Sequence, residues 1–213
     1  MSIFTKKFFI ITAHPDDFEM GCGGLTAKIN AHGGSVTNLV LVQPSAETNT
    51  QRDIHIVQNE LAESEKVLTR HTIIYDTPLH KNGRPNLQLT NNLITFAEDV
   101  SKDHDILISH WREDYHQDHR VCFEVAQSIS RKGFEQFWCM DQAPYNIHYK
   151  NFTCNLYIDV TDYIEDKINA INCYSSYFDK ESVKQIIDYN SYRGKFIGSN
   201  KIAETFQQIY NKI

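Results

Sequence analysis

Apolar runs of strand length alternate with amphipathic segments along most of the chain. Runs suited to strands cover residues 7–12, 35–42, 72–75, 105–109 and 135–140. Between them, apolar residues recur at the three- and four-residue spacing of helices. The pattern therefore predicts helices over residues 21–31, 53–69, 91–102 and 120–130, with a turn at Gly33-Gly34.

Strands that alternate with helices indicate a parallel sheet, because parallel neighbours need crossover connections and those crossovers are right-handed. We therefore predict an α/β fold: a single Rossmann-like domain over residues 1–213, with a mostly parallel sheet and helices on both faces. No repeat or Pro/Gly/Ser-rich linker marks a domain boundary. Beyond residue 140, the pattern predicts a strand over 154–160, a helix over 162–178 and helical segments up to residue 210.

Composition and charge exclude several classes of partner. The net charge is -6 and no block of Lys or Arg is present, so we expect no nucleic-acid partner. After the lysines of residues 1–7, only about six apolar positions follow, too few for a signal peptide or a membrane span. The five cysteines form no Cys-x-x-Cys pair, which argues against a disulfide framework. We expect a soluble, cytoplasmic protein, and a homo-oligomer remains open.

The first candidate motif follows the first predicted strand directly. It reads Ala13-His14-Pro15-Asp16-Asp17 and continues through Glu19 to the glycines at 21, 23 and 24. Its proline fixes its own φ and favours an extended residue before it. One imidazole and one carboxylate make two thirds of a catalytic zinc site of the two-His, one-carboxylate type, which leaves a coordination position for water. A further ligand must come from elsewhere.

The second candidate motif lies about a hundred residues later. The stretch Asp114-Tyr115-His116-Gln117-Asp118-His119 packs two histidines and two acids into six positions. It follows the strand predicted over 105–109, and parallel strands deliver the loops at their carboxyl ends to one edge of the sheet. We therefore expect the two motifs to meet there.

Together, these residues resemble the signature of the PIG-L or LmbE-like family, the N-acetylglucosaminyl-phosphatidylinositol de-N-acetylases. The likeness extends to weaker family positions: Tyr157-Ile158-Asp159-Val160-Thr161, Lys167, Ala170, Tyr174, Ser176 and Ala203-Glu204-x-Phe206. The sequence departs from the family at Gln117, where proline is usual, and at Val57, where arginine is common.

The resemblance implies a zinc-dependent hydrolase that removes an acetyl group from an N-acetylated amino sugar or small glycoside. It implies metal ligands at His14, Asp17 and His119 and a general base at Asp16. His116 would stabilise the oxyanion or protonate the leaving amine, and Asp118 would orient an active-site histidine. The same ligands suit Fe²⁺ as well as Zn²⁺.

Ordinary structural roles compete with these assignments. Asp16, Asp17 or Asp118 could each be a helix N-cap, and Glu19 would be favourable near a helix N-terminus. His116 could face solvent. The remaining histidines lack partners at ligand spacing and are interpreted as surface or packing residues: His32, His55, His71, His80, His104, His110 and His148. The tyrosines of the last third, Tyr174 among them, are interpreted as packing residues, with one or two lining a sugar pocket.

Two other functions remain open from the sequence. One is a noncatalytic carbohydrate- or metal-binding protein on the same scaffold, which would keep the ligands and lose the base or acid; retention of Asp16, His116 and Asp118 argues against it. The other is an amidase acting on a non-sugar or sulfur-conjugate amide with the same zinc chemistry. The sequence does not assign substrate-binding residues.

Overall fold

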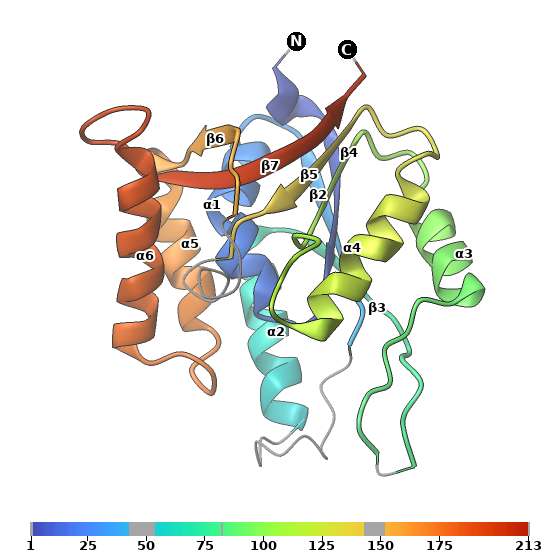
Figure 1. The fold of residues 1–213 in the computed structure, drawn as a ribbon. Helices are drawn as coiled ribbons and strands as arrows, with labels where there is room; N and C mark the ends of the chain where they lie inside the picture. The colour runs from blue at the N-terminus through green and yellow to red at the C-terminus, as the bar shows by residue number, and fades with distance from the viewer. Residues whose placement is uncertain (1, 43–53, 82, 143–151, 213) are drawn as a thin grey trace.

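One seven-stranded sheet forms the centre of the computed structural model, which describes residues 2–42, 54–81, 83–142 and 152–212 (Figure 1). The strands lie in the order β3-β2-β1-β4-β5-β7-β6. The first five pair in parallel, whereas β7 runs antiparallel to both β5 and β6. The prediction of a mostly parallel α/β fold is confirmed. The strands are β1 Lys7–Thr12, β2 Ser35–Val40, β3 His71–Ile74, β4 Ile106–Ser109, β5 Gln136–Met140, β6 Leu156–Asp159 and β7 Ala203–Asn211.

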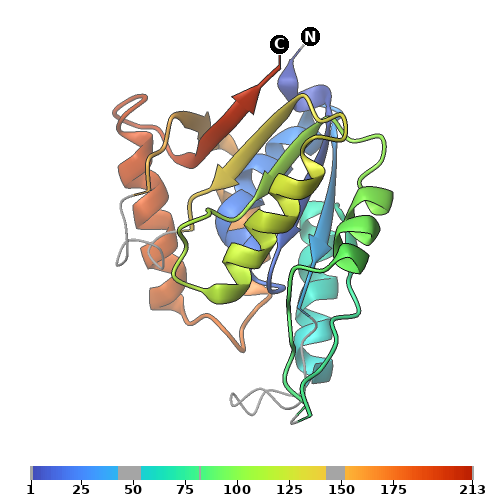
Figure 2. The same cartoon turned by 45° about the vertical axis from the view of Figure 1, so that its right-hand side comes forward.

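Helices cover both faces of the sheet. Helices α3 and α4 pack on one face, and α1, α2 and α5 lie on the other, with α6 outside α5 (Figures 1 and 2). Among the described residues, no helix is both long and apolar enough to cross a membrane. The helices are α1 Asp17–Ala31, α2 Ile54–Leu68, α3 Asn91–Val100, α4 Gln117–Ile129, α5 Ile164–Asn172 and α6 Lys180–Gly194, with 3₁₀ turns η1 Ile3–Thr5 and η2 Thr161–Tyr163.

The central strands are apolar on both sides, because each side is covered by helices. In β1, Phe9 and Ile11 join the core under α3 and α4, whereas Phe8 and Ile10 join the core under α1. All four side chains are fully buried. Burial of each contributes about 1.5–3 kcal/mol relative to exposure, so β1 is rigidly held up to the residue where the first motif begins.

Helix α1 begins four residues earlier than the sequence pattern indicates, at Asp17 rather than Gly21. The glycines belong to the interior of the helix. A Cβ on Gly24 would lie 2.8 Å from Cβ of Val160, so the close approach of α1 to the chain after β6 requires glycine here. A glycine within a helix costs about 0.5–1 kcal/mol relative to alanine, and this packing overrides that propensity. Asp17 therefore lies in the first turn of α1.

Two predictions for the last third are wrong. The helix expected over 162–178 ends at Asn172, and the helical segments expected up to residue 210 end in a strand, β7. Ile202, Phe206 and Ile209 recur at helical spacing, yet β7 pairs with β5 and β6. Those pairings are made with residues far away in the sequence, so local periodicity does not report them.

Candidate metal centre

The two motif loops meet at one edge of the sheet, as the sequence predicts. Strands β1 and β4 are parallel neighbours, with Ile10 paired to Ile108. The loop after β1 carries His14. The loop after β4 carries His116 and leads into α4, whose first turn holds His119. The His14 ring centroid lies 4.8 Å from that of His116 and 5.6 Å from that of His119.

Asp17 is the centre of this cluster. Its Oδ2 lies 3.3 Å from Nδ1 of His14, and its Oδ1 lies 3.3 Å from Nε2 of His119. The backbone N–H of His14 donates to Oδ2 at 2.7 Å, which fixes the carboxylate against the loop. Asp17 is only 6% exposed. The structure thus brings together the three residues that the family resemblance suggests as metal ligands.

Each of these two imidazoles contacts a second carboxylate through the ring nitrogen that does not face Asp17. Oδ2 of Asp118 lies 3.3 Å from Nε2 of His14, and Oδ1 of Asp114 lies 3.1 Å from Nδ1 of His119. Carboxylates in this position fix the orientation and tautomer of metal-binding histidines. The nitrogen of each ring that faces Asp17 is therefore the one left for a ligand. The sequence interpretation gave Asp114 no role.

Neither Asp16 nor Asp118 caps a helix with its side chain, although the sequence allowed both as N-caps. Asp16 occupies the N-cap position of α1, but its side chain makes no capping hydrogen bond. In α4 the N-cap is His116, whose Nδ1 accepts from the backbone N–H of Asp118 at 3.2 Å. The ring hydrogen of a neutral His116 is therefore on Nε2, which leaves Nε2–H as a donor. Because neither side chain caps a helix, those of Asp16 and Asp118 are available for acid–base chemistry or for orienting His14.

Burial and charge set the protonation of the site. Burial and the neighbouring Asp17 charge raise the pKa of Asp16 to about 7. Burial also opposes ionisation of Asp17, yet the charge of the neighbouring His119 holds the pKa of Asp17 well below the usual value. Burial and the charge of His14 lower the pKa of His116. One carboxyl group is thus poised to exchange a proton near neutral pH, beside another that stays ionised.

The two candidate imidazole ligands bind protons tightly in the metal-free protein. Burial would lower the pKa of His14, but hydrogen bonds with Asp118 and Asp17 outweigh it and raise the pKa to about 10. Burial opposes the charge on His119 too, and Asp17 and Asp114 raise its pKa to about 9. Positive charge is therefore favoured at both rings.

The residues fit a divalent cation. The imidazole-to-Asp17 distances of 3.3 Å are longer than the 2.7–2.9 Å of strong charge-assisted hydrogen bonds. Ligand atoms of His14, His116 and His119 lie within 4.8 Å of one another, as do those of Asp17, His110 and His119. Asp17 links the two sets through Oδ2 near His14 Nδ1 and Oδ1 near His119 Nε2, while the other nitrogen of each of these two rings lies near a carboxylate. Two imidazoles and one carboxylate with ordered carboxylate partners are a donor set suited to Zn²⁺ or Fe²⁺.

Sequence reasoning missed His110, which is fully buried and is not a surface residue. Its Nε2 accepts from the backbone N–H of Ala13 at 3.0 Å, and its ring stacks on His119 with centroids 3.8 Å apart. Its position directly after β4 was the available signal. None of the other described histidines given packing roles joins the cluster, and His148 lies outside the described residues.

Sequence reasoning also missed the buried support beneath the first loop. Glu19 is fully buried, with Nη2 of Arg70 2.6 Å from its Oε1 and the Ser64 hydroxyl donating to the same oxygen. The Tyr174 hydroxyl donates to the Pro15 carbonyl at 2.9 Å. Glu19 therefore has a buried ionic partner, Arg70, in addition to the expected interaction with the helix N-terminus. The last third of the chain also holds the loop, through Tyr174.

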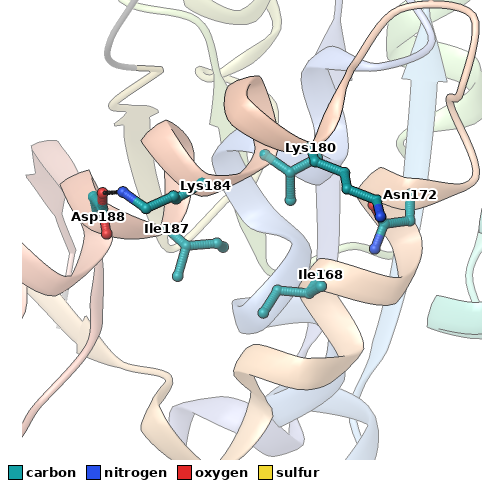
Figure 3. A pocket seen from close by; sticks show the side chains of 7 residues that line it. Ile168, Asn172, Lys180, Lys184, Ile187 and Asp188 are labelled. Carbon is teal, nitrogen blue, oxygen red and sulfur yellow. Dashed lines mark hydrogen bonds and ion pairs between the residues drawn. The ribbon is translucent and has the colours of Figure 1, made fainter.

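A groove lies away from these residues. This groove, of about 430 Å³, lies between α5 and α6, and no residue of the metal centre lines it (Figure 3). Its lining is mostly apolar, and its two lysines lie along α6. The lining residues are Ile168, Asn172, Lys180, Val183, Lys184, Ile187 and Asp188.

Known proteins resemble this chain in both sequence and fold. The family model described as PIG-L, GlcNAc-PI de-N-acetylase, matches residues 9–130, more than half of the chain. The chain belongs to the PIG-L family. Both motif loops lie within the matched segment of this PIG-L protein.

Proteins similar to this PIG-L chain include ones named as deacetylases. Over 133 residues it is 29% identical to Uncharacterized deacetylase YaiS of Escherichia coli (strain K12), a match that covers 59% of this chain and 69% of that protein. The structure of N,N'-diacetylchitobiose deacetylase from Pyrococcus horikoshii is similar at a TM-score of 0.73, with 17% identity and coverage of 96% and 84% of the two chains. GalB, the 4-carboxy-2-hydroxymuconate hydratase from Pseudomonas putida KT2440, gives a TM-score of 0.81, 16% identity and 98% coverage of each chain. At these identities, structural likeness shows the fold alone, and the fold carries more than one reaction.

Proposed function

We propose that this protein is a metal-dependent de-N-acetylase that acts on an N-acetylated amino sugar or small glycoside. The observation that carries the proposal is the convergence of His14, Asp17 and His119 at the sheet edge, with Asp16 and His116 beside them. The family supports hydrolysis of an N-acetyl group. The metal, Zn²⁺ or alternatively Fe²⁺, and the sugar substrate are inferred from the donor set and from the family.

The reaction adds water to the acetyl carbonyl, breaks the C–N bond and releases acetate and a free amine. When bound, Zn²⁺ would lower the pKa of an adjacent water from 15.7 to about 7 and offset charge on the carbonyl oxygen. Asp16, whose pKa of about 7 suits a general base at neutral pH, takes the proton of that water. His116 Nε2–H donates to the developing oxyanion. The proton held by Asp16 then passes to the leaving nitrogen, while Asp118 and Asp114 keep His14 and His119 in place.

A panel assay tests this function. Free amine and acetate are measured in parallel from N-acetylhexosamine derivatives, including nucleotide, inositol and malate glycosides, with enzyme loaded with Zn²⁺ and with enzyme after chelation. We expect equimolar amine and acetate from at least one derivative, lost on chelation and restored by metal. Protein shown to hold metal that releases neither product from any derivative would point instead to a non-sugar amide.

Metal uptake is expected to depend steeply on pH. The raised pKa values of His14, about 10, and His119, about 9, mean that both rings of metal-free protein are protonated at neutral pH. Both protons must leave before the nitrogens can bind metal. Below about pH 9, affinity should therefore fall roughly tenfold per pH unit for each proton displaced, or about 100-fold for two. Chelator competition at several pH values, with calorimetry in buffers of different ionisation enthalpy, measures this. Uptake without proton release would contradict it.

A further inference from the structure

His110 joins the two loops that carry the candidate ligands. It is the first residue after β4, and the last paired residues of β1 and β4 are Ile10 and Ile108. Beyond them, the backbone N–H of Ala13 donates to the side chain of His110 rather than to a backbone carbonyl. The imidazole thus extends the contact between the two strands up to the residue that precedes His14.

The same ring contacts both other candidate ligands. It stacks on His119 at an interplanar angle of 20°, and its Nε2 lies 3.4 Å from Oδ2 of Asp17. Gln142, which follows β5, donates from Nε2 to the backbone carbonyl of Asp17 at 2.9 Å on another side. His110 is therefore in contact with Asp17 and His119 and with the backbone next to His14.

The hydrogen bond from Ala13 also restricts what His110 can do. Its Nε2 lone pair is used to accept this bond, so the ring hydrogen of the neutral imidazole is on Nδ1. A nitrogen that accepts a backbone hydrogen bond cannot at the same time bind a cation. His110 therefore differs from His14 and His119, each of which keeps a ring nitrogen facing Asp17.

We propose that His110 is a positioning residue that holds the His14 loop and His119 in the relative arrangement needed to bind the cation. This inference rests on the metal site of the proposed function. Loss of the Nε2 acceptor would leave a buried backbone N–H without its partner and would loosen the loop immediately before His14. This loss should lower the affinity for the metal and alter its coordination geometry, and not only reduce the stability of the fold.

Two amide substitutions separate these effects. The His110→Gln side chain places its amide near the position of Nε2 and can accept from Ala13, whereas His110→Asn reaches only the position of Nδ1. Both lose the ring stacked on His119, so their difference isolates the acceptor. His104→Gln is the matched control: His104 precedes the other end of β4, where its Nε2 lies 3.0 Å from the Thr37 hydroxyl and its ring packs near Phe9.

The experiment measures Zn²⁺ affinity by chelator competition and the visible absorption of Co²⁺-loaded protein, together with thermal unfolding of the metal-free forms. We expect His110→Asn to bind Zn²⁺ about 10–100-fold more weakly, the range found for outer partners of metal ligands, and to alter the Co²⁺ spectrum. His110→Gln should restore most of the affinity and the wild-type spectrum. His104→Gln should lower the unfolding temperature without changing either metal readout.

The possible contrary outcomes are distinct. Wild-type affinity and spectrum in His110→Asn would overturn the positioning role and leave the proposed function standing. Equal losses in His110→Gln and His110→Asn would overturn the role of the acceptor, as would a loss in His104→Gln that matches His110→Asn. Wild-type protein that binds neither Zn²⁺ nor Co²⁺ would overturn this inference and the proposed function together.

Discussion

Asp16→Asn is expected to lower kcat by about 10²–10⁴-fold on any N-acetylated sugar that the wild-type enzyme hydrolyses. The amide keeps the size of the side chain but cannot take the proton of the attacking water. Asp16 makes no capping hydrogen bond in α1, so the change removes no support from the helix. Steady-state kinetics with metal quantified in the same samples measures the effect, and metal content should equal that of the wild type.

Asp17→Ala is the matched control on the neighbouring residue. It removes the carboxylate that lies 3.3 Å from each of the two candidate imidazole ligands, so this variant should lose bound metal and activity together. A metal-free Asp16→Asn protein would show that Asp16 is a ligand and that the division between base and ligand is wrong. Full activity in Asp16→Asn would remove it from the mechanism.

Glu204→Gln is expected to lower the free energy of unfolding by about 3–5 kcal/mol, the usual result of removing one member of a buried ion pair. Glu204 on β7 and Lys167 on α5 are 2.7 Å apart and almost completely buried. The Glu204 carboxylate also accepts from the backbone N–H groups of Gly24 and Leu25, and Lys167 donates to the Met20 carbonyl. The substitution leaves a buried ammonium unpaired inside the packing around α1.

Urea unfolding of three further variants tests this explanation. Lys167→Met should destabilise the protein to a similar degree, and Lys167→Met combined with Glu204→Gln should lose less than the sum of the single changes, because no buried charge remains. Lys184→Met is the control, since the Lys184–Asp188 pair on α6 is well exposed and exposed ion pairs contribute little to stability. Losses under about 1 kcal/mol in both buried single variants would contradict the prediction.

Lys167 and Glu204 are among the weaker family positions of the last third, and their role in the structure is this buried ion pair. Tyr174 and Ser176, two more of these positions, also make specific contacts. Tyr174 reaches the Pro15 carbonyl, and the Ser176 backbone N–H and hydroxyl donate to Glu60 of α2 at 2.7 and 2.6 Å. These contacts also explain why the helix predicted over 162–178 stops at Asn172. The chain leaves the helix there, and the two residues contact the first loop and α2.

The pattern of apolar and polar positions along the chain was enough to predict the part of the fold that brings the two motifs together. Short apolar runs separated by amphipathic helices require a parallel sheet, and parallel strands place the loops after β1 and β4 at the same edge. The resemblance to the PIG-L family then implied His14, Asp17 and His119 as candidate ligands before any distance was known. Their convergence follows from topology, which the order of elements along the sequence encodes.

Only the tertiary structure decided which groups support that site. The position of His110 after β4 was a signal, but its contacts and the Arg70 partner of Glu19 could not be read from spacing, because these contacts join residues that are distant in the sequence. The strand β7 was likewise hidden, since Phe206 and its neighbours fit a helical period until β5 and β6 pair with them. The sequence alone determined that both motif loops lie at one edge of a parallel sheet, and which types of ligand they carry. Packing determined which carboxylate faces which imidazole, because that choice depends on distances of a few ångströms between separate elements.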